Sequence, residues 1–180
     1  MTDTNRIVVL VGSLRAGSLN RRIAEALRDQ APEGVVVEIA DGLHELPFYN
    51  EDIDTDAVPA AAEALRAQVA GADAVLAVTP EYNGTMPAVL NNAIDWLSRP
   101  YGVGAIRGKR FGVVGATPTP YGGKWAHEHA LRSAGIAGAE VVEEALVSQS
   151  ALEVDVLTDP EVLAKFHGAL LRLSTLQPAV

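Results

Sequence analysis

The stretch Gly12 to Asn20, GSLRAGSLN, places hydroxyl, amide and guanidinium groups between an apolar run and a segment with helical spacing. A helix N-terminus presents unpaired backbone N–H groups and a partial positive charge. With Ser13, Ser18 and Asn20 as added donors and Arg15 as a cation, the loop is predicted to bind a phosphate. It lacks the G-K-[ST] and G-x-G-x-x-G patterns, so it favours a terminal monophosphate over a nucleoside triphosphate or a dinucleotide. Helix capping alone would leave Ser13 and Arg15 unexplained.

A second set of candidate binding groups lies in Thr79 to Pro87, TPEYNGTMP, which follows another apolar run. Its prolines and glycine keep the backbone out of regular structure, so N–H and C=O groups from Glu81 to Gly84 are predicted to face a planar heterocycle. Tyr82 adds an aromatic face. The alternative is a plain strand-to-helix connection in which Asn83 and Gly84 supply the turn and Thr85 caps the helix.

A third loop, Thr117 to Trp125, has the sequence TPTPYGGKW. Its adjacent glycines are predicted to let the backbone approach a ligand closely, and Thr117 and Tyr121 to lend hydroxyls. An ordinary flexible connection explains the same residues.

Five apolar runs and five segments with helical spacing alternate along the chain and must position these loops. The run Ile7–Val11 is apolar on both faces, which is typical of a central parallel strand. The other predicted strands are Val35–Ile39, Ala74–Thr79, Arg110–Ala116 and the weaker Glu140–Val142, and the predicted helices are Asn20–Gln30, Pro59–Ala70, Pro87–Leu97, Lys124–Ala134 and one that starts near Pro160. This alternation predicts an α/β fold: a doubly wound five-stranded parallel sheet with helices on both faces, in one domain over residues 1–180. Ligands of such sheets bind beyond the carboxyl ends of the strands, so the three loops are expected to outline one pocket for a phosphate tail and a flat ring.

Composition restricts the chemistry and the partners. The 180 residues include no cysteine, which excludes thiolate nucleophiles and thiolate metal sites, so any redox chemistry must come from a cofactor. A net charge of −9 argues against nucleic acid as a partner. No apolar run is long enough to cross a bilayer, and the polar start of the chain has no secretion signal, so no membrane association and a cytoplasmic location are expected.

The three motifs, in this order and spacing, resemble the NADPH-dependent FMN reductase family, which includes bacterial quinone, chromate and azo-compound reductases with a flavodoxin-like fold. The resemblance implies FMN as cofactor and NADPH or NADH as electron donor. It assigns the FMN phosphate to Ser13, Arg15, Ser18 and Asn20, and the ribityl and isoalloxazine groups to Pro80, Glu81, Tyr82, Asn83 and Gly84, with Thr117 as a weaker match.

The resemblance also implies a mechanism in which no side chain is a catalytic acid, base or nucleophile. Hydride passes from the nicotinamide to flavin N5 and then to a quinone, flavin, azo compound or metal oxyanion, by ping-pong kinetics. Backbone N–H groups of the second loop would stabilise negative charge at the pyrimidine edge of the flavin. An FMN electron carrier of the flavodoxin type is the main alternative. A hydrolase with Ser13 as nucleophile is less favoured, because no G-x-S-x-G elbow or activating Asp and His pair is present.

The resemblance further implies that the flavin pocket is completed at a subunit interface, so a homodimer or homotetramer is expected. The predicted helix around Asn91 to Leu97 is a candidate contact, with Trp96 either exposed there or buried in the core.

Two patterns suggest metals but are interpreted otherwise. Four acidic residues have the spacing of positions 1, 3, 5 and 12 of a calcium-binding EF-hand loop, but the position that needs glycine is Ala57 and Pro59 interrupts the loop. They are Asp52, Asp54, Asp56 and Glu63. His127 and His129 would point to opposite sides of a helix, so they are expected to be surface residues, and no metal site is predicted.

Overall fold

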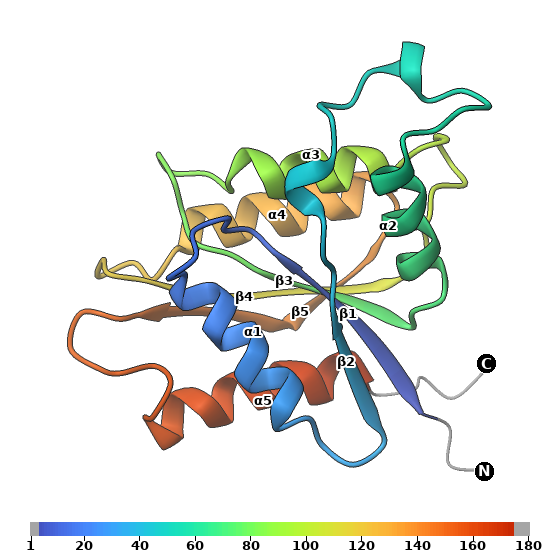
Figure 1. Cartoon of the computed structure of the whole chain (residues 1–180). Coiled ribbons are helices and arrows are strands. Elements are labelled where there is room, and N and C mark those ends of the chain that lie inside the picture. Colours follow the sequence, from blue (N-terminus) through green and yellow to red (C-terminus); the bar gives the residue numbers. More distant parts are fainter. Residues whose placement is uncertain (1–3, 175–180) are drawn as a thin grey trace.

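The computed structural model describes residues 4–174, and in them the chain alternates between strands and helices (Figure 1). The strands are β1 (Asn5–Val11), β2 (Val35–Ile39), β3 (Ala74–Val78), β4 (Arg110–Thr117) and β5 (Glu140–Ser150). The α-helices are α1 (Leu19–Asp29), α2 (Ala60–Ala70), α3 (Ala88–Leu97), α4 (Lys124–Ile136) and α5 (Pro160–Ser174), and two short 3-10 helices, η1 (Leu43–Glu45) and η2 (Glu51–Ile53), lie between β2 and α2.

All five strands are parallel and form one sheet in the order β2-β1-β3-β4-β5. From β1 the chain first moves outward to β2 and then crosses to β3 on the other side. The direction of winding therefore reverses between β1 and β3. The carboxyl ends of these two strands are where a doubly wound sheet opens a crevice for a ligand.

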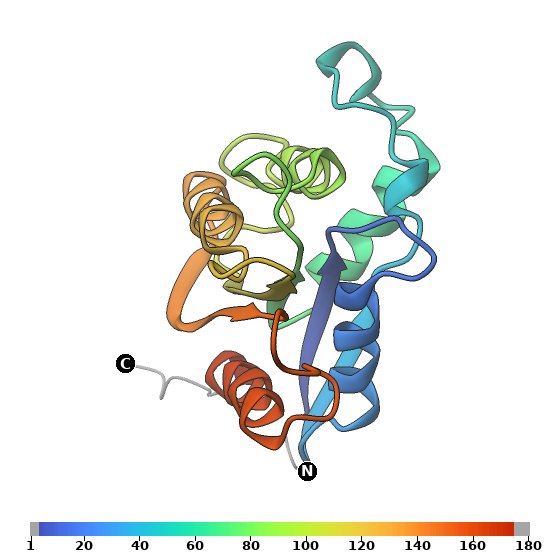
Figure 2. The same cartoon turned by 90° about the vertical axis from the view of Figure 1, so that its left-hand side faces the viewer.

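Helices cover both faces of the sheet, α2, α3 and α4 on one face and α1 and α5 on the other (Figures 1 and 2). Each face has its own apolar core. The core under α2, α3 and α4 contains Val8, Leu10, Val75 and Ala77, whereas the core under α1 and α5 contains the alternate strand residues. Strands β1 and β3 are apolar on both faces because both faces are buried, which confirms the predicted doubly wound sheet.

The last strand is longer than the sequence predicts. Only Glu140–Val142 was expected, but β5 extends to Ser150. An irregularity between Phe111 and Val113 shifts the register, so that Glu140 and Val141 pair before it and Leu146 to Ser150 after it. This bulge interrupts the alternation of apolar residues in an edge strand, and the interruption hides the second half from pattern analysis.

Between η1 and α2, residues 47–58 project beyond the helices (Figures 1 and 2). The side chain of Trp96 in α3 anchors the start of this arm, because its Nε1 donates to the Pro47 carbonyl at 2.8 Å. Asn92 also donates to that carbonyl and accepts from the Tyr49 N–H at 2.8 Å. Trp96 is fully buried, so of the two predicted alternatives it belongs to the core.

Asp54 anchors the far end of the arm. Its carboxylate accepts two hydrogen bonds of 2.7 Å from the Arg66 guanidinium of α2, and these side chains are only 9% and 17% exposed. Arg66 also lies over the ring of Trp96, 5.2 Å from its centroid. Asp54 is therefore part of an ion pair that fastens the arm to the body of the protein. Within residues 4–174, no helix is both long and apolar enough to cross a membrane.

Candidate functional site

The first predicted loop leaves β1 and enters α1 as the sequence indicates. Ser18 is the N-cap of α1, with extended backbone, and its Oγ accepts from the Arg21 N–H at 3.2 Å. The N–H groups of Leu19 and Asn20, at the start of the helix, have no intrahelical acceptor. The first turn of α1 contains no acidic residue. This end of the helix therefore presents the donors and the partial charge that attract an anion.

Asn20 serves a purpose that the sequence does not reveal. Its amide nitrogen donates to the Ala116 carbonyl of β4 at 2.9 Å, and its Oδ1 accepts from the Ala116 N–H at 3.0 Å. The side chain is buried. It therefore ties the start of α1 to β4, and the backbone N–H is the group of Asn20 that faces the loop as a donor.

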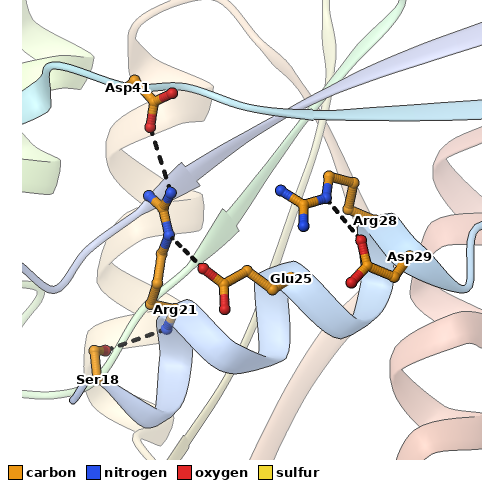
Figure 3. A network of polar contacts seen from close by, with 6 residues as sticks. All are labelled: Ser18, Arg21, Glu25, Arg28, Asp29 and Asp41. Carbon is orange, nitrogen blue, oxygen red and sulfur yellow. Dashed lines mark hydrogen bonds and ion pairs between the residues drawn. The ribbon is translucent and has the colours of Figure 1, made fainter. Parts of the chain in front are cut away.

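The two arginines near this loop differ in their surroundings. Arg21 is held by Glu25 at 3.1 Å and Asp41 at 3.4 Å (Figure 3). Arg15 is exposed and has no ion-pair partner among residues 4–174. The free guanidinium of the loop is thus that of Arg15, as an anion-binding role requires.

The second predicted loop begins beside the first, at the point where the winding reverses. The Gly12 N–H donates to the Val78 carbonyl at 2.9 Å. A Cβ added at Gly12 would lie 2.2 Å from the Thr79 Oγ1, so only glycine fits there. The loops after β1 and β3 are therefore in direct contact.

The tip of the second loop is a tight two-residue turn. Tyr82 and Thr85 exchange two backbone hydrogen bonds, of 3.0 and 3.1 Å, across Asn83 and Gly84. Both tip residues have positive φ, 53° and 74°, which is the geometry of a type I′ turn and explains the Asn-Gly pair. The expectation that the Tyr82 backbone is free for a ligand is wrong. The N–H groups of Asn83 and Gly84, which the turn does not use, remain at the exposed tip.

Helix α4 holds this loop along its length. The Ala126 N–H, in the first turn of α4, donates to the Glu81 carboxylate at 3.1 Å, which supplies the cap that Gly123 lacks. The Thr85 hydroxyl contacts His129 instead of capping α3, whose N-cap is Pro87. Glu81 and Thr85 thus lock the loop onto α4.

The third predicted loop, between β4 and α4, is exposed from Pro118 to Tyr121 and buried at Gly122 and Gly123. The Thr117 hydroxyl pairs with that of Thr119 at 2.9 Å. A Cβ on Gly122 would lie 2.6 Å from the Gln149 backbone, and one on Gly123 would lie 3.0 Å from the His127 ring. These glycines allow close packing against β5 and α4, not the approach to a ligand that the sequence suggested.

His127, expected at the surface, is completely buried. Its Nε2 lies 2.9 Å from the Thr79 carbonyl and its Nδ1 lies 2.7 Å from the Ser148 Oγ. Burial lowers the pKa of His127 below its ordinary value. The ring shares a helical stripe with buried Ala126, Ala130 and Leu131, and this spacing is the signal that could have placed it in the interior.

Two hollows open at this edge of the sheet. Exposed residues of the first loop line one of them, and exposed residues of the second loop line the other. One of about 540 Å³ is lined by Ser13 and Arg15 together with η1 and Asp41. The other, of about 640 Å³, is lined by Tyr82, Asn83, Phe48 and the start of α3. Asp95 also lines the second hollow, and burial raises the pKa of its carboxyl.

Comparison with known proteins identifies the family. Residues 5–153 match the model of the NADPH-dependent FMN reductases. The chain belongs to this family. It is 45% identical to a quinone reductase of Pseudomonas putida over 132 residues, which cover 73% of this chain and 70% of that protein. It is 43% identical to a 2-hydroxy-1,4-benzoquinone reductase of Burkholderia sp. over 124 residues, 69% of this chain and 67% of that protein.

Solved structures agree with this membership. FerB, a flavoenzyme NAD(P)H:(acceptor) oxidoreductase from Paracoccus denitrificans, is 30% identical and superposes with a TM-score of 0.83 over 94% of this FMN reductase and 96% of that chain. A WrbA-like flavodoxin from Agrobacterium tumefaciens, 22% identical, shares the fold at a TM-score of 0.61 over 94% and 95% of the two chains. The predicted flavodoxin-like fold, the FMN-dependent oxidoreductase class and the NAD(P)H dependence are confirmed.

Proposed function

We propose that this FMN reductase is a quinone reductase, in which NAD(P)H and a proton reduce a quinone to the hydroquinone. The quinone reductases that share over 40% of their aligned residues with it are the observation that carries the choice of acceptor. Aromatic side chains of Phe48, Tyr49 and Tyr82 wall the hollow of about 640 Å³, which suits a flat, mostly apolar ring.

The first loop fits the FMN phosphate. The free N–H groups at the start of α1, the Ser13 hydroxyl and the unpaired Arg15 are all donors, and neither the loop nor the first turn of the helix adds a carboxylate that would repel a doubly charged group. We assign phosphate binding to Ser13, Arg15, Ser18 and Asn20, with Asn20 contributing its backbone N–H.

The second loop would hold the ring system of the flavin. Pro80, Glu81, Tyr82, Asn83 and Gly84 leave the same end of the sheet as the phosphate loop, and the two loops touch through Gly12 and Thr79. The tip N–H groups of Asn83 and Gly84 are the backbone donors that we assign to the negative pyrimidine edge. Thr117, whose hydroxyl is engaged with Thr119, has a lesser part.

When bound, FMN supplies the redox chemistry, because its N5 accepts a hydride from the nicotinamide and the reduced ring returns two electrons to the acceptor. The residues of this chain bind and orient the reactants. A single ring face used in turn by the nicotinamide and the quinone requires that one leave before the other enters. The kinetics are therefore expected to be ping-pong.

Anaerobic reduction tests the function directly. Purified protein loaded with FMN is mixed with one equivalent of NADPH without oxygen, and the flavin absorbance is followed before and after 1,4-benzoquinone is added. We expect rapid bleaching and then recovery with one equivalent of hydroquinone formed. Flavin that stays oxidised would indicate an electron carrier, and bleaching without recovery on quinone would exclude this acceptor.

The assembly, the location and the domain organisation expected from the sequence belong to the proposal as well. We infer a homodimer or homotetramer that covers the aromatic hollow, because Phe48 is 80% exposed at its rim. Sedimentation of Phe48→Ser should then show smaller particles than the wild type. Leu152→Ser, at another exposed apolar residue outside this hollow, should not. The cytoplasmic location and the single FMN-binding domain over residues 1–180 stay predictions.

A further inference from the structure

The ladder of backbone hydrogen bonds between β3 and β4 ends at Thr79, one residue before the second loop continues with Pro80 to Gly84. Val78 pairs with Val114, and the Thr79 N–H still donates to the Val114 carbonyl at 3.1 Å. In a regular parallel ladder, the next bond would join the Ala116 N–H to the Thr79 carbonyl. Instead, the Ala116 N–H donates to the Asn20 Oδ1 at 3.0 Å. The ladder is therefore replaced at this point by side-chain contacts.

His127 takes the carbonyl that the ladder releases. Its Nε2 lies 2.9 Å from the Thr79 oxygen, and Thr79 is fully buried, so no water can serve as a substitute donor without rearrangement. An unpaired carbonyl here would cost the desolvation of a buried acceptor. The contact is thus required wherever the loop keeps this path.

The protonation state of His127 follows from its two partners. A carbonyl only accepts, so Nε2 carries a hydrogen. The Ser148 hydroxyl, 2.7 Å from Nδ1, can donate to the lone pair of that nitrogen. Burial favours the neutral ring. Ser148 therefore holds the imidazole as the Nε2–H tautomer, ready to donate to Thr79.

The Thr79 carbonyl, the His127 ring and the Asn20 amide pack closely against Gly115. A Cβ added at Gly115 would lie 2.1 Å from the Thr79 oxygen, 2.8 Å from the His127 Nε2 and 2.9 Å from the Asn20 Oδ1. Glycine is what lets these three groups meet against β4. Because the peptide bond between Thr79 and Pro80 is planar, the direction of the Thr79 carbonyl also sets the direction in which Pro80 leaves β3.

We propose that His127 is a positioning residue for the flavin-binding loop: it replaces the missing β-ladder donor to Thr79 and thereby sets the path of Pro80 to Gly84 at the ring of FMN. Asn20 of α1 is its counterpart, because it accepts from the Ala116 N–H of β4. The Asn20 side chain belongs to the first loop and bonds to β4 where the β3–β4 ladder ends. It thereby connects the first loop to the second loop. This role rests on the flavin site proposed above.

Two substitutions at the same position test it. In His127→Gln, the amide nitrogen can replace the imidazole Nε2 as donor, whereas His127→Leu leaves an apolar group of similar volume and an unpaired carbonyl. FMN affinity is measured by quenching of flavin fluorescence, under conditions where each variant is folded by circular dichroism. We expect the Kd of His127→Leu to rise about tenfold or more and that of His127→Gln to stay within about threefold.

A purely structural role would give another pattern. His127→Leu would then melt at a lower temperature but bind FMN as the wild type does, and that result would overturn the inference while leaving the flavin site intact. Wild-type protein that fails to quench flavin fluorescence would overturn both. A matched control is Arg132→Leu, in the same helix but exposed and away from the second loop, for which a change in Kd below about threefold is expected.

A second measurement keeps the test valid if His127→Leu does not fold. Nitrogen NMR of ¹⁵N-histidine-labelled wild-type protein at pH 7 reports the tautomer. We expect a protonated Nε2 and an unprotonated Nδ1 for His127, and Ser148→Ala should weaken that preference. A protonated Nδ1 with a bare Nε2 would remove the donor to Thr79 and refute the inference without any flavin present.

Discussion

At the scale of single residues, two arginines close together in the sequence have different surroundings. Arg21 borders the first loop and is shared between Glu25 and Asp41 (Figure 3). Arg15, within that loop, is exposed and has no ion-pair partner among the described residues. A guanidinium already engaged by two carboxylates has less to offer an incoming anion. Recognition of the phosphate should therefore depend on Arg15.

We predict that Arg15→Ala raises the Kd for FMN about tenfold, the lower end of the range for a charge-assisted hydrogen bond, because Arg15 is exposed. Fluorescence titration at constant salt measures the change. Arg21→Ala is the control and should alter the Kd by less than about threefold. Equal Kd values for Arg15→Ala and the wild type would remove Arg15 from the site.

The backbone conformation of Gly84, and not the space around it, restricts which residues the second loop accepts at this position. No atom lies within 4 Å of a Cβ added there, but φ is +74°. We predict that Gly84→Val weakens FMN binding while the sheet stays folded, since a β-branched residue cannot hold the type I′ turn without strain. Gly84→Asn, whose side chain tolerates positive φ, should bind closer to the wild type. Titration and circular dichroism decide, and unchanged binding by Gly84→Val would count against a role for this tip.

At the scale of elements, the arm over residues 47–58 is attached to α2 and α3 by a few polar contacts. Among them, the ion pair between Asp54 and Arg66 has two hydrogen bonds and is mostly shielded from water. Hydrogen bonds with Arg66 hold the pKa of Asp54 below its ordinary value. A carboxyl with a depressed pKa stabilises the folded state above its unfolded pKa, and that contribution is lost as the pH falls through the folded pKa.

We predict that Asp54→Asn lowers the free energy of unfolding at pH 7 by about 1 to 3 kcal/mol and exposes the arm to proteases. Urea denaturation and limited proteolysis measure the two effects. The difference from the wild type should shrink below about pH 4, because the protonated wild-type carboxyl then resembles the amide. Asp52→Asn, in the exposed part of the arm, should behave as the wild type, and a pH-independent difference would contradict the assignment.

At the scale of the whole molecule, packing around Gly115 couples the two loops and α4. We predict that Gly115→Ala destabilises the protein by about 1 to 3 kcal/mol, because its Cβ would overlap the Thr79 backbone. Gly168→Ala, in the middle of α5 with no atom within 4 Å of the added Cβ, should instead stabilise it by about 0.5 to 1 kcal/mol. Urea denaturation of both variants is the measurement. If Gly115→Ala were as stable as the wild type, the groups packed against Gly115 would be able to move apart without cost, and the assignment would be wrong.

Local patterns were enough to predict the architecture. Runs apolar on both faces, such as Ile7–Val11, indicate buried parallel strands, and Ser18 marks the start of α1. These features depend on neighbours in the chain, and the topology then brings the first two predicted loops together at the carboxyl ends of β1 and β3. The Asn-Gly turn is likewise local, although its tightness was underestimated.

Only the tertiary structure decided what the polar side chains contact. The Asn20 amide pairs with a residue 96 positions away, and His127 with a carbonyl 48 positions away. No periodicity in one segment specifies a partner in another, because such contacts depend on how helices and strands pack once the sheet has formed. The sequence predicts too short a β5 for the same reason. This half-polar strand is specified by its pairing with β4 and not by its own pattern. Sequence thus determined which groups are available for binding, and folding determined which of them are already engaged.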